Sequence, residues 1–106
     1  MTDDDQRFMQ IALGLARTAR DAGEVPVGAV VILGDGVVGR GHNSSIELTD
    51  PTAHAEVLAL RNAAKTVGNY RLVGSTVYCQ VAAATPGGAA FGVVDLSHGL
   101  QIVIGR

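Results

Sequence analysis

The sequence contains very little sulfur and very few aromatic rings. Its 106 residues include one cysteine, Cys79, two tyrosines, two phenylalanines and no tryptophan. A lone cysteine excludes a framework of internal disulfides and leaves the redox compartment open. Because 47% of the residues are nevertheless apolar, the chain can bury a core, which has to be built mainly from Val, Leu, Ile and Ala.

Positive charge is also scarce. The formal net charge is −2, so an RNA partner would have to be held by a local basic patch. No apolar run approaches the length that crosses a bilayer. The N-terminal stretch is acidic at Asp3, Asp4 and Asp5, where a secretory signal would be basic. We therefore expect a cytoplasmic protein with no membrane partner.

The first half of the chain reads as a helix followed by a hairpin. Apolar residues recur at spacings of three and four through residues 3–22, which predicts an amphipathic helix ended by Gly23. Residues 27–33 and 37–42 are apolar, β-branched runs separated by a Gly-Asp-Gly turn, which predicts a hairpin. The first of these strands has so few polar residues that we expect it to be covered on both faces.

The second half is expected to contain one helix and two strands. Asp50 and Pro51 predict a helix start, with Asp50 as N-cap, and the helix is expected to run to about Val67. Residues 75–81 and 101–104 read as strands, whereas residues 82–100 show no clear period. This order predicts the α/β class, as a three-layer α/β/α sandwich around a mixed sheet, in a single domain spanning residues 1–106.

The stretch with most chemistry is the predicted start of the second helix. It carries His54 and Glu56, two residues apart, which is about 200° of rotation on a helix and does not place them on one face. At a helix start, however, both side chains can flank a pocket. Histidine is the commonest metal ligand, and a nearby carboxylate can move protons to and from a metal-bound water. The alternative is an acid that favours a helix N-terminus beside an exposed histidine.

Four segments together resemble the bacterial tRNA adenosine deaminases, within the cytidine deaminase-like superfamily of zinc deaminases, in both order and spacing. They are residues 23–30 (GEVPVGAV), 41–43 (GHN), 50–61 (DPTAHAEVLALR) and 69–72 (NYRL). The resemblance extends over about residues 8–81, while residues 82–106 diverge. It implies a cytidine deaminase-like fold.

The resemblance also implies a reaction and a set of roles. In this family a zinc ion held by one His and two Cys activates water for attack on C6 of a flipped-out adenine, and a Glu moves the protons, which gives inosine. His54 would be the zinc ligand and Glu56 the catalytic proton shuttle. Asn43 would contact the base or ribose, the Ala55 backbone would line the pocket, and Val27 would form part of its wall. The implied partners are tRNA and a second copy of the chain, as a homodimer.

The sequence departs from this family at the other half of the zinc site. The Pro-Cys-x-x-Cys motif should follow the third strand, and its two cysteine positions are occupied by Ala84 and Gly87, neither of which has a metal-binding side chain. Cys79 lies nearby in sequence, but strand alternation gives it no special reason to face the pocket. The chain also ends earlier than the family pattern, so we expect a fold shortened at its C-terminus.

Three functions therefore stay open. The first is an active zinc deaminase with an unusual set of ligands. The second is a catalytically inactive deaminase-fold module that binds RNA or pairs with another subunit, with Arg61, Lys65 and Arg71 as its clustered basic residues. The third is an altered or truncated product in which only the fold survives.

Overall fold

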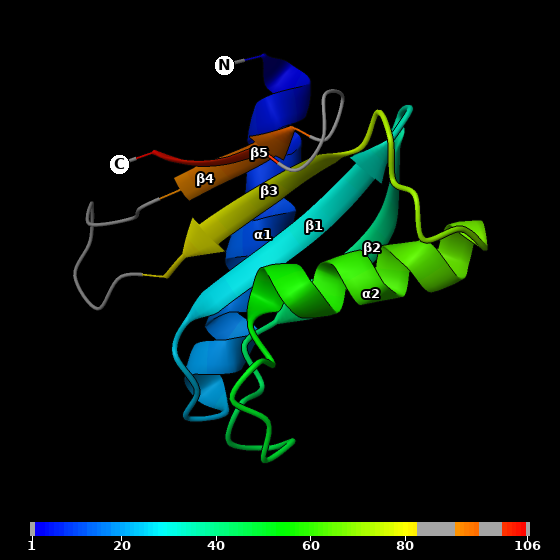
Figure 1. Ribbon diagram of the computed structural model, residues 1–106. Coiled ribbons are helices and arrows are strands. Elements are labelled where there is room, and N and C mark those ends of the chain that lie inside the picture. The colour runs from blue at the N-terminus through cyan, green and yellow to red at the C-terminus, as the bar shows by residue number, and fades with distance from the viewer. Residues whose placement is uncertain (1, 83–90, 96–100, 106) are drawn as a thin grey trace.

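The computed structural model describes residues 2–82, 91–95 and 101–105. Its two helices and five strands follow one another in the order α1 (Asp3–Asp21), β1 (Val27–Leu33), β2 (Gly36–His42), α2 (Ala55–Val67), β3 (Thr76–Val81), β4 (Phe91–Asp95) and β5 (Gln101–Gly105). The strands form one sheet in the order β2-β1-β3-β4-β5. Figure 1 shows α1 and α2 on opposite faces of this sheet. The predicted three layers are therefore confirmed.

The alternation of β1 explains why both helices can pack on one strand. Ala29 and Val31 are fully buried against α2 on one face, in a cluster that includes Ala55, Ala59 and Val77. Val30 and Ile32 point to the other face, where they pack with Phe8 and Ala12 of α1. Because successive side chains of a strand point to opposite faces, a strand covered on both sides has to be apolar throughout, as the sequence predicts.

The sheet differs from the mixed sheet that the element order predicts. Every pairing among the described strands is antiparallel: β1 with β2, β1 with β3, β3 with β4, and β4 with β5. The helical crossover through α2 does join two strands of the same direction, β2 and β3, but β1 lies between them. No parallel neighbours result among these five strands. β4 itself lies inside the segment 82–100, where the Ala- and Gly-rich composition gives no strand period.

Local signals predict α1 well. The helix begins one residue after Thr2, whose hydroxyl accepts a hydrogen bond from the Asp5 N–H while the Asp5 carboxylate accepts one from the Thr2 N–H. This reciprocal capping satisfies N–H groups that have no partner within the helix. The Tyr78 hydroxyl on β3 donates to the same Asp5 carboxylate and ties the helix start to the sheet.

The predicted start of the second helix is wrong by several residues. Asp50 does not cap a helix: its Oδ1 accepts from the Thr52 N–H at 2.8 Å and from the Thr52 hydroxyl at 2.7 Å, which closes a separate turn. The helix α2 begins at Ala55, with His54 as the N-cap residue. It ends at Gly68, whose φ of 70° is a left-handed conformation that favours glycine.

The helix α2 lies unusually close to β2. A Cβ atom built on Gly41 would lie 2.6 Å from the backbone nitrogen of Ala59, and one on Gly39 would lie 2.7 Å from the Cβ of Ala63. The helix presents alanines on this face, so glycines of β2 pack against alanines of α2. The other helix repeats the arrangement, since a Cβ on Gly28 would lie 2.7 Å from the Cβ of Leu15. Neither described helix is long and apolar enough to cross a membrane.

We predict that Gly41→Ala destabilises the protein by about 2 kcal/mol, because the added methyl group meets helix backbone and not a flexible side chain. Gly14→Ala is the matched control. Gly14 lies within α1 and a Cβ there meets nothing within 4 Å, so this variant should be more stable by about 0.5–1 kcal/mol. Urea denaturation measures both. Equal stabilities for the two variants would contradict the close packing at Gly41.

Candidate functional site

The predicted site residues that the structure describes meet at one end of the sheet, where β1 begins, β2 ends and α2 begins. The Val27 carbonyl accepts a hydrogen bond from the Asn43 N–H at 3.0 Å. The Asn43 side chain then accepts one from the Ala55 N–H through its Oδ1, at 2.7 Å. Three residues that are far apart in the sequence are therefore joined by consecutive hydrogen bonds. His54 and Glu56 flank the last of them.

Asn43 is the residue that caps α2. It is only 7% exposed, and its carbonyl oxygen satisfies an N–H group in the first turn that the helix itself cannot satisfy. His54 occupies the N-cap position with an extended backbone, φ −79° and ψ 151°, but its side chain makes no capping hydrogen bond. Asn43 therefore supplies the cap, and His54 is exposed.

His54 and Glu56 have different electrostatic neighbours. The Thr52 hydroxyl and N–H bonds hold the pKa of Asp50 below its ordinary value, with smaller contributions from the positive charges of Arg61 and His54. Glu56 is half-buried, and its negative charge acts on Cys79 in β3. The two side chains thus differ in burial, since His54 is exposed.

Cys79 faces the α2 layer, which strand alternation alone left undecided. It packs against the cluster that contains Ala55 and Ala59. Burial, and to a smaller extent the charge of Glu56, raises the pKa of the Cys79 thiol to about 12. A protonated, half-buried thiol is a weak nucleophile, and among the described residues Cys79 belongs to no cluster of three side chains that could hold a metal ion.

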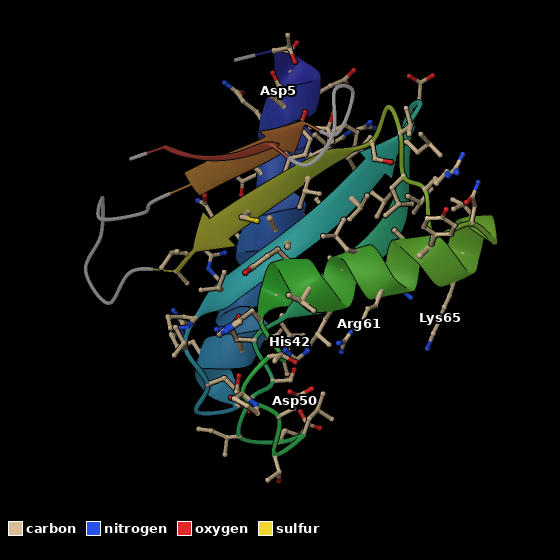
Figure 2. The ribbon with its side chains drawn as sticks, viewed as in Figure 1. Asp5, His42, Asp50, Arg61 and Lys65 are labelled. Carbon is tan, nitrogen blue, oxygen red and sulfur yellow. The ribbon has the colours of Figure 1, made fainter. Side chains whose placement is uncertain are left out.

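Figure 2 shows the surroundings of this end of the molecule. His42 and Asp50 lie where α2 begins, and Arg61 and Lys65 project from α2 away from the sheet. The His42 Nδ1 lies 3.3 Å from the Asn43 carbonyl and 3.3 Å from the Ser44 hydroxyl, so His42 is engaged by its neighbours. Glu24 belongs to the GEVPVGAV segment, and the sequence assigns it no role. Its buried carboxylate accepts hydrogen bonds from the backbone of the 43–54 loop.

The described residues do not fit a zinc ion. A catalytic zinc has three protein ligands and one open position. Within the part of the chain that the structure describes, no group of three or more His, Cys, Asp or Glu residues could hold a metal ion. The positions of the expected cysteines, Ala84 and Gly87, lie outside the described residues, and neither has a donor atom in its side chain. His54 is therefore the sole residue of the expected ligand set in the sequence.

Comparison with known proteins identifies the family of this site. Residues 2–89 match the family model for the cytidine and deoxycytidylate deaminase zinc-binding region. The tRNA-specific adenosine deaminase of Buchnera aphidicola subsp. Baizongia pistaciae is 53% identical over 78 residues, which are 74% of this chain and 48% of that protein. The enzyme of the same name from Haemophilus influenzae is 52% identical over 70% of this chain and 43% of its own length. The chain spans about half the length of these relatives.

Solved structures agree with the sequence matches. A structure from work on A-to-I editing by tRNA:A34 deaminases at the wobble position of transfer RNA superposes with a TM-score of 0.68 and 43% identity, covering 70% of this chain and 57% of that one. The guanine deaminase of Bacillus subtilis superposes with a TM-score of 0.66 and 36% identity, covering 74% and 50%. Deaminases of more than one base thus share this arrangement.

We predict that Asn43→Ala lowers the free energy of unfolding by about 1–2 kcal/mol, because α2 loses its cap. Asn43→Asp keeps an acceptor oxygen at the helix N-terminus and should be close to wild type. The control is Asn62→Ala, which removes an exposed acceptor bonded to the Arg40 N–H and should cost less than about 0.5 kcal/mol. Denaturation with urea and hydrogen exchange at the Ala55 amide report both effects. An unchanged Ala55 exchange rate in Asn43→Ala would be inconsistent with this cap.

A second prediction concerns alkaline pH. The ordinary thiol pKa of 9.0 applies to the unfolded chain, whereas the folded pKa is about 12. Below pH 9 both states keep the proton; between these values only the unfolded state loses it, so stability falls as pH rises. Wild type should lose more stability than Cys79→Ala over this window in denaturation experiments. Parallel pH profiles for the two proteins would rule out a buried, protonated Cys79.

Proposed function

Because this chain belongs to the cytidine and deoxycytidylate deaminase family, we propose that it binds an adenosine in a transfer RNA loop and does not deaminate it by itself. The proposed pocket is the helix start that Val27, Asn43 and Ala55 build. The observation that carries the proposal is the hydrogen-bond chain through these three residues. It holds the substrate side of the site in place independently of a metal.

The groups at the pocket match the chemistry of adenine. The Oδ1 of Asn43 is committed to the Ala55 N–H, which leaves the two donor hydrogens of the amide nitrogen for a ribose hydroxyl or a base nitrogen. The Glu56 carboxylate can accept a hydrogen bond from the exocyclic amino group of adenine. The exposed side chain of His54, two residues before Glu56, can contact the same base. These roles bind and orient the base.

In this proposal the chain does not generate the nucleophile of the family's hydrolysis, which is a zinc-activated water. The family's reaction depends on water activated by a zinc ion, and the residues that the structure describes do not supply three ligands. Glu56 alone has no metal-bound water to deprotonate. An active enzyme with an unusual ligand set is therefore the less favoured candidate. The homodimer that the family resemblance implies stays a prediction.

The support for tRNA as the partner comes from relatives. Those named tRNA-specific adenosine deaminases in Buchnera and Haemophilus share about half of their residues with this chain over the matched region. The guanine deaminase match means that fold alone does not choose the base. Arg61 and Lys65 on the exposed side of α2 provide positive charge for a phosphate backbone.

The test combines elemental analysis with RNA binding, on protein purified without a metal-binding tag. We expect far less than one zinc per chain and no inosine in a tRNA incubated with the protein. A labelled stem-loop RNA with a loop adenosine should bind about tenfold more tightly than the same RNA with an abasic site there, which corresponds to about 1.4 kcal/mol from base contacts. Anisotropy at fixed salt measures both affinities.

The matched variant carries Ala84→Cys together with Gly87→Cys, which restores the ligand types at the family spacing. It should bind about one zinc per chain if the spacing is right. Two results would contradict the proposal for the wild-type chain. One is stoichiometric zinc with inosine formation, and the other is equal affinity for the adenosine and abasic RNAs.

A further inference from the structure

Glu24 is a buried acid on the connection between α1 and β1. It is 7% exposed. Its Oε1 accepts a hydrogen bond from the Ile46 N–H at 3.0 Å, and its Oε2 accepts one from the Glu47 N–H at 2.9 Å. Both carboxylate oxygens are therefore used. Burying a carboxylate is costly unless such bonds compensate for lost hydration, and hydrogen bonds to a charged acceptor are stronger than those between neutral groups.

The loop that Glu24 holds connects two parts of the candidate site. Residues 43–54 run from the end of β2 to the start of α2. At the neck of this loop the Ser44 N–H donates to the Ala53 carbonyl at 3.0 Å. Bonds inside the loop are short-range, such as that from the Leu48 N–H to the Ser44 carbonyl at 2.9 Å. Glu24 is a second anchor from another part of the chain, in addition to the bond from the Asn43 N–H to the Val27 carbonyl, and it lies 22 residues before Ile46.

The anchored loop holds apolar side chains in solvent. Ile46 is 71% exposed and Leu48 is 53% exposed. Val25, next to Glu24 in the sequence, is 64% exposed. Because the carboxylate bonds the Ile46 and Glu47 amides from the protein side, the loop cannot collapse inward to bury these side chains without breaking charged hydrogen bonds. The Glu24 bonds thus hold the loop backbone at Ile46 and Glu47 while the Ile46 side chain stays exposed.

We propose that Glu24 is a positioning residue for RNA binding: its carboxylate fixes the 43–54 loop, and through it the placement of Asn43 and His54 around a loop adenosine. This inference rests on the proposed function. Glu24 touches no substrate atom in this account. It acts through the two amides that it bonds, and the stem-loop RNA meets the loop that these amides shape.

The test compares Glu24→Gln with Glu47→Gln. Both variants remove one negative charge, and both residues belong to the same contact, but Glu47 contributes only its backbone N–H. A glutamine at position 24 can accept one of the two hydrogen bonds, while its NH₂ group faces the other donor. Glu24→Asp is the conservative variant, which keeps the charge on a side chain shorter by one carbon. It also serves if Glu24→Gln fails to fold.

We expect amide hydrogen exchange at Ile46 and Glu47 to quicken in Glu24→Gln and to stay at wild-type rates in Glu47→Gln. The preference for adenosine over abasic stem-loop RNA should fall about tenfold in Glu24→Gln, since one charged hydrogen bond is lost. Affinity for the abasic RNA should match that of Glu47→Gln, because both variants remove one negative charge and the contact that Glu24→Gln weakens is one to the base. Glu24→Asp should give an intermediate preference.

Two outcomes overturn the role of Glu24. In one, the Glu24 variants keep the wild-type preference for adenosine. In the other, they lose affinity for both RNAs equally, as a general loss of folded protein would cause. A wild-type chain without any preference is a different result: it refutes the proposed function itself, whatever the exchange rates of Ile46 and Glu47.

Discussion

The helix α2 packs so closely on β2 that there is no room for a side chain at Gly39 or Gly41. Gly39 and Gly41 face the alanines of α2 at distances where a Cβ atom would meet helix backbone. Interiors this dense transmit small changes, because packed groups have no space in which to relax. The position of the first turn of α2, and hence of His54 and Glu56, follows from this contact. Asn43 then fixes the turn chemically by bonding the Ala55 N–H.

The site consists of two halves with separate origins. The proposed substrate half is built from backbone and amide groups of residues within 27–56, and its hydrogen bonds join protein atoms only. The metal half depends on side chains beyond β3, and the sequence supplies no thiol or imidazole at Ala84 or Gly87. A family that combines both halves can deaminate. We propose that a chain with the first half alone keeps the means to orient a base, and that Glu24 extends that half to the 43–54 loop.

Sequence reasoning succeeded where the deciding interactions are local. The boundaries of α1 and the β1–β2 hairpin follow from periodicity, capping and turn residues within a few positions. It failed at the start of α2, because the cap comes from Asn43, 12 residues earlier. Motif resemblance placed Val27, Asn43 and Ala55 in one site, and the structure brings them together. The orientation of Cys79 toward α2 and the two hydrogen bonds that the Glu24 carboxylate accepts depend on tertiary packing, which no local pattern encodes.

The central claim is that the substrate half of the site works without the metal half. An NMR titration of the chelator-treated protein with the adenosine stem-loop RNA tests it most directly, by following the backbone amides. The account predicts that the Asn43, Ala55 and Glu56 amides shift and saturate together, and that adding zinc changes nothing. Shifts confined to other parts of the described chain, or shifts at these amides that appear only with zinc, would contradict it.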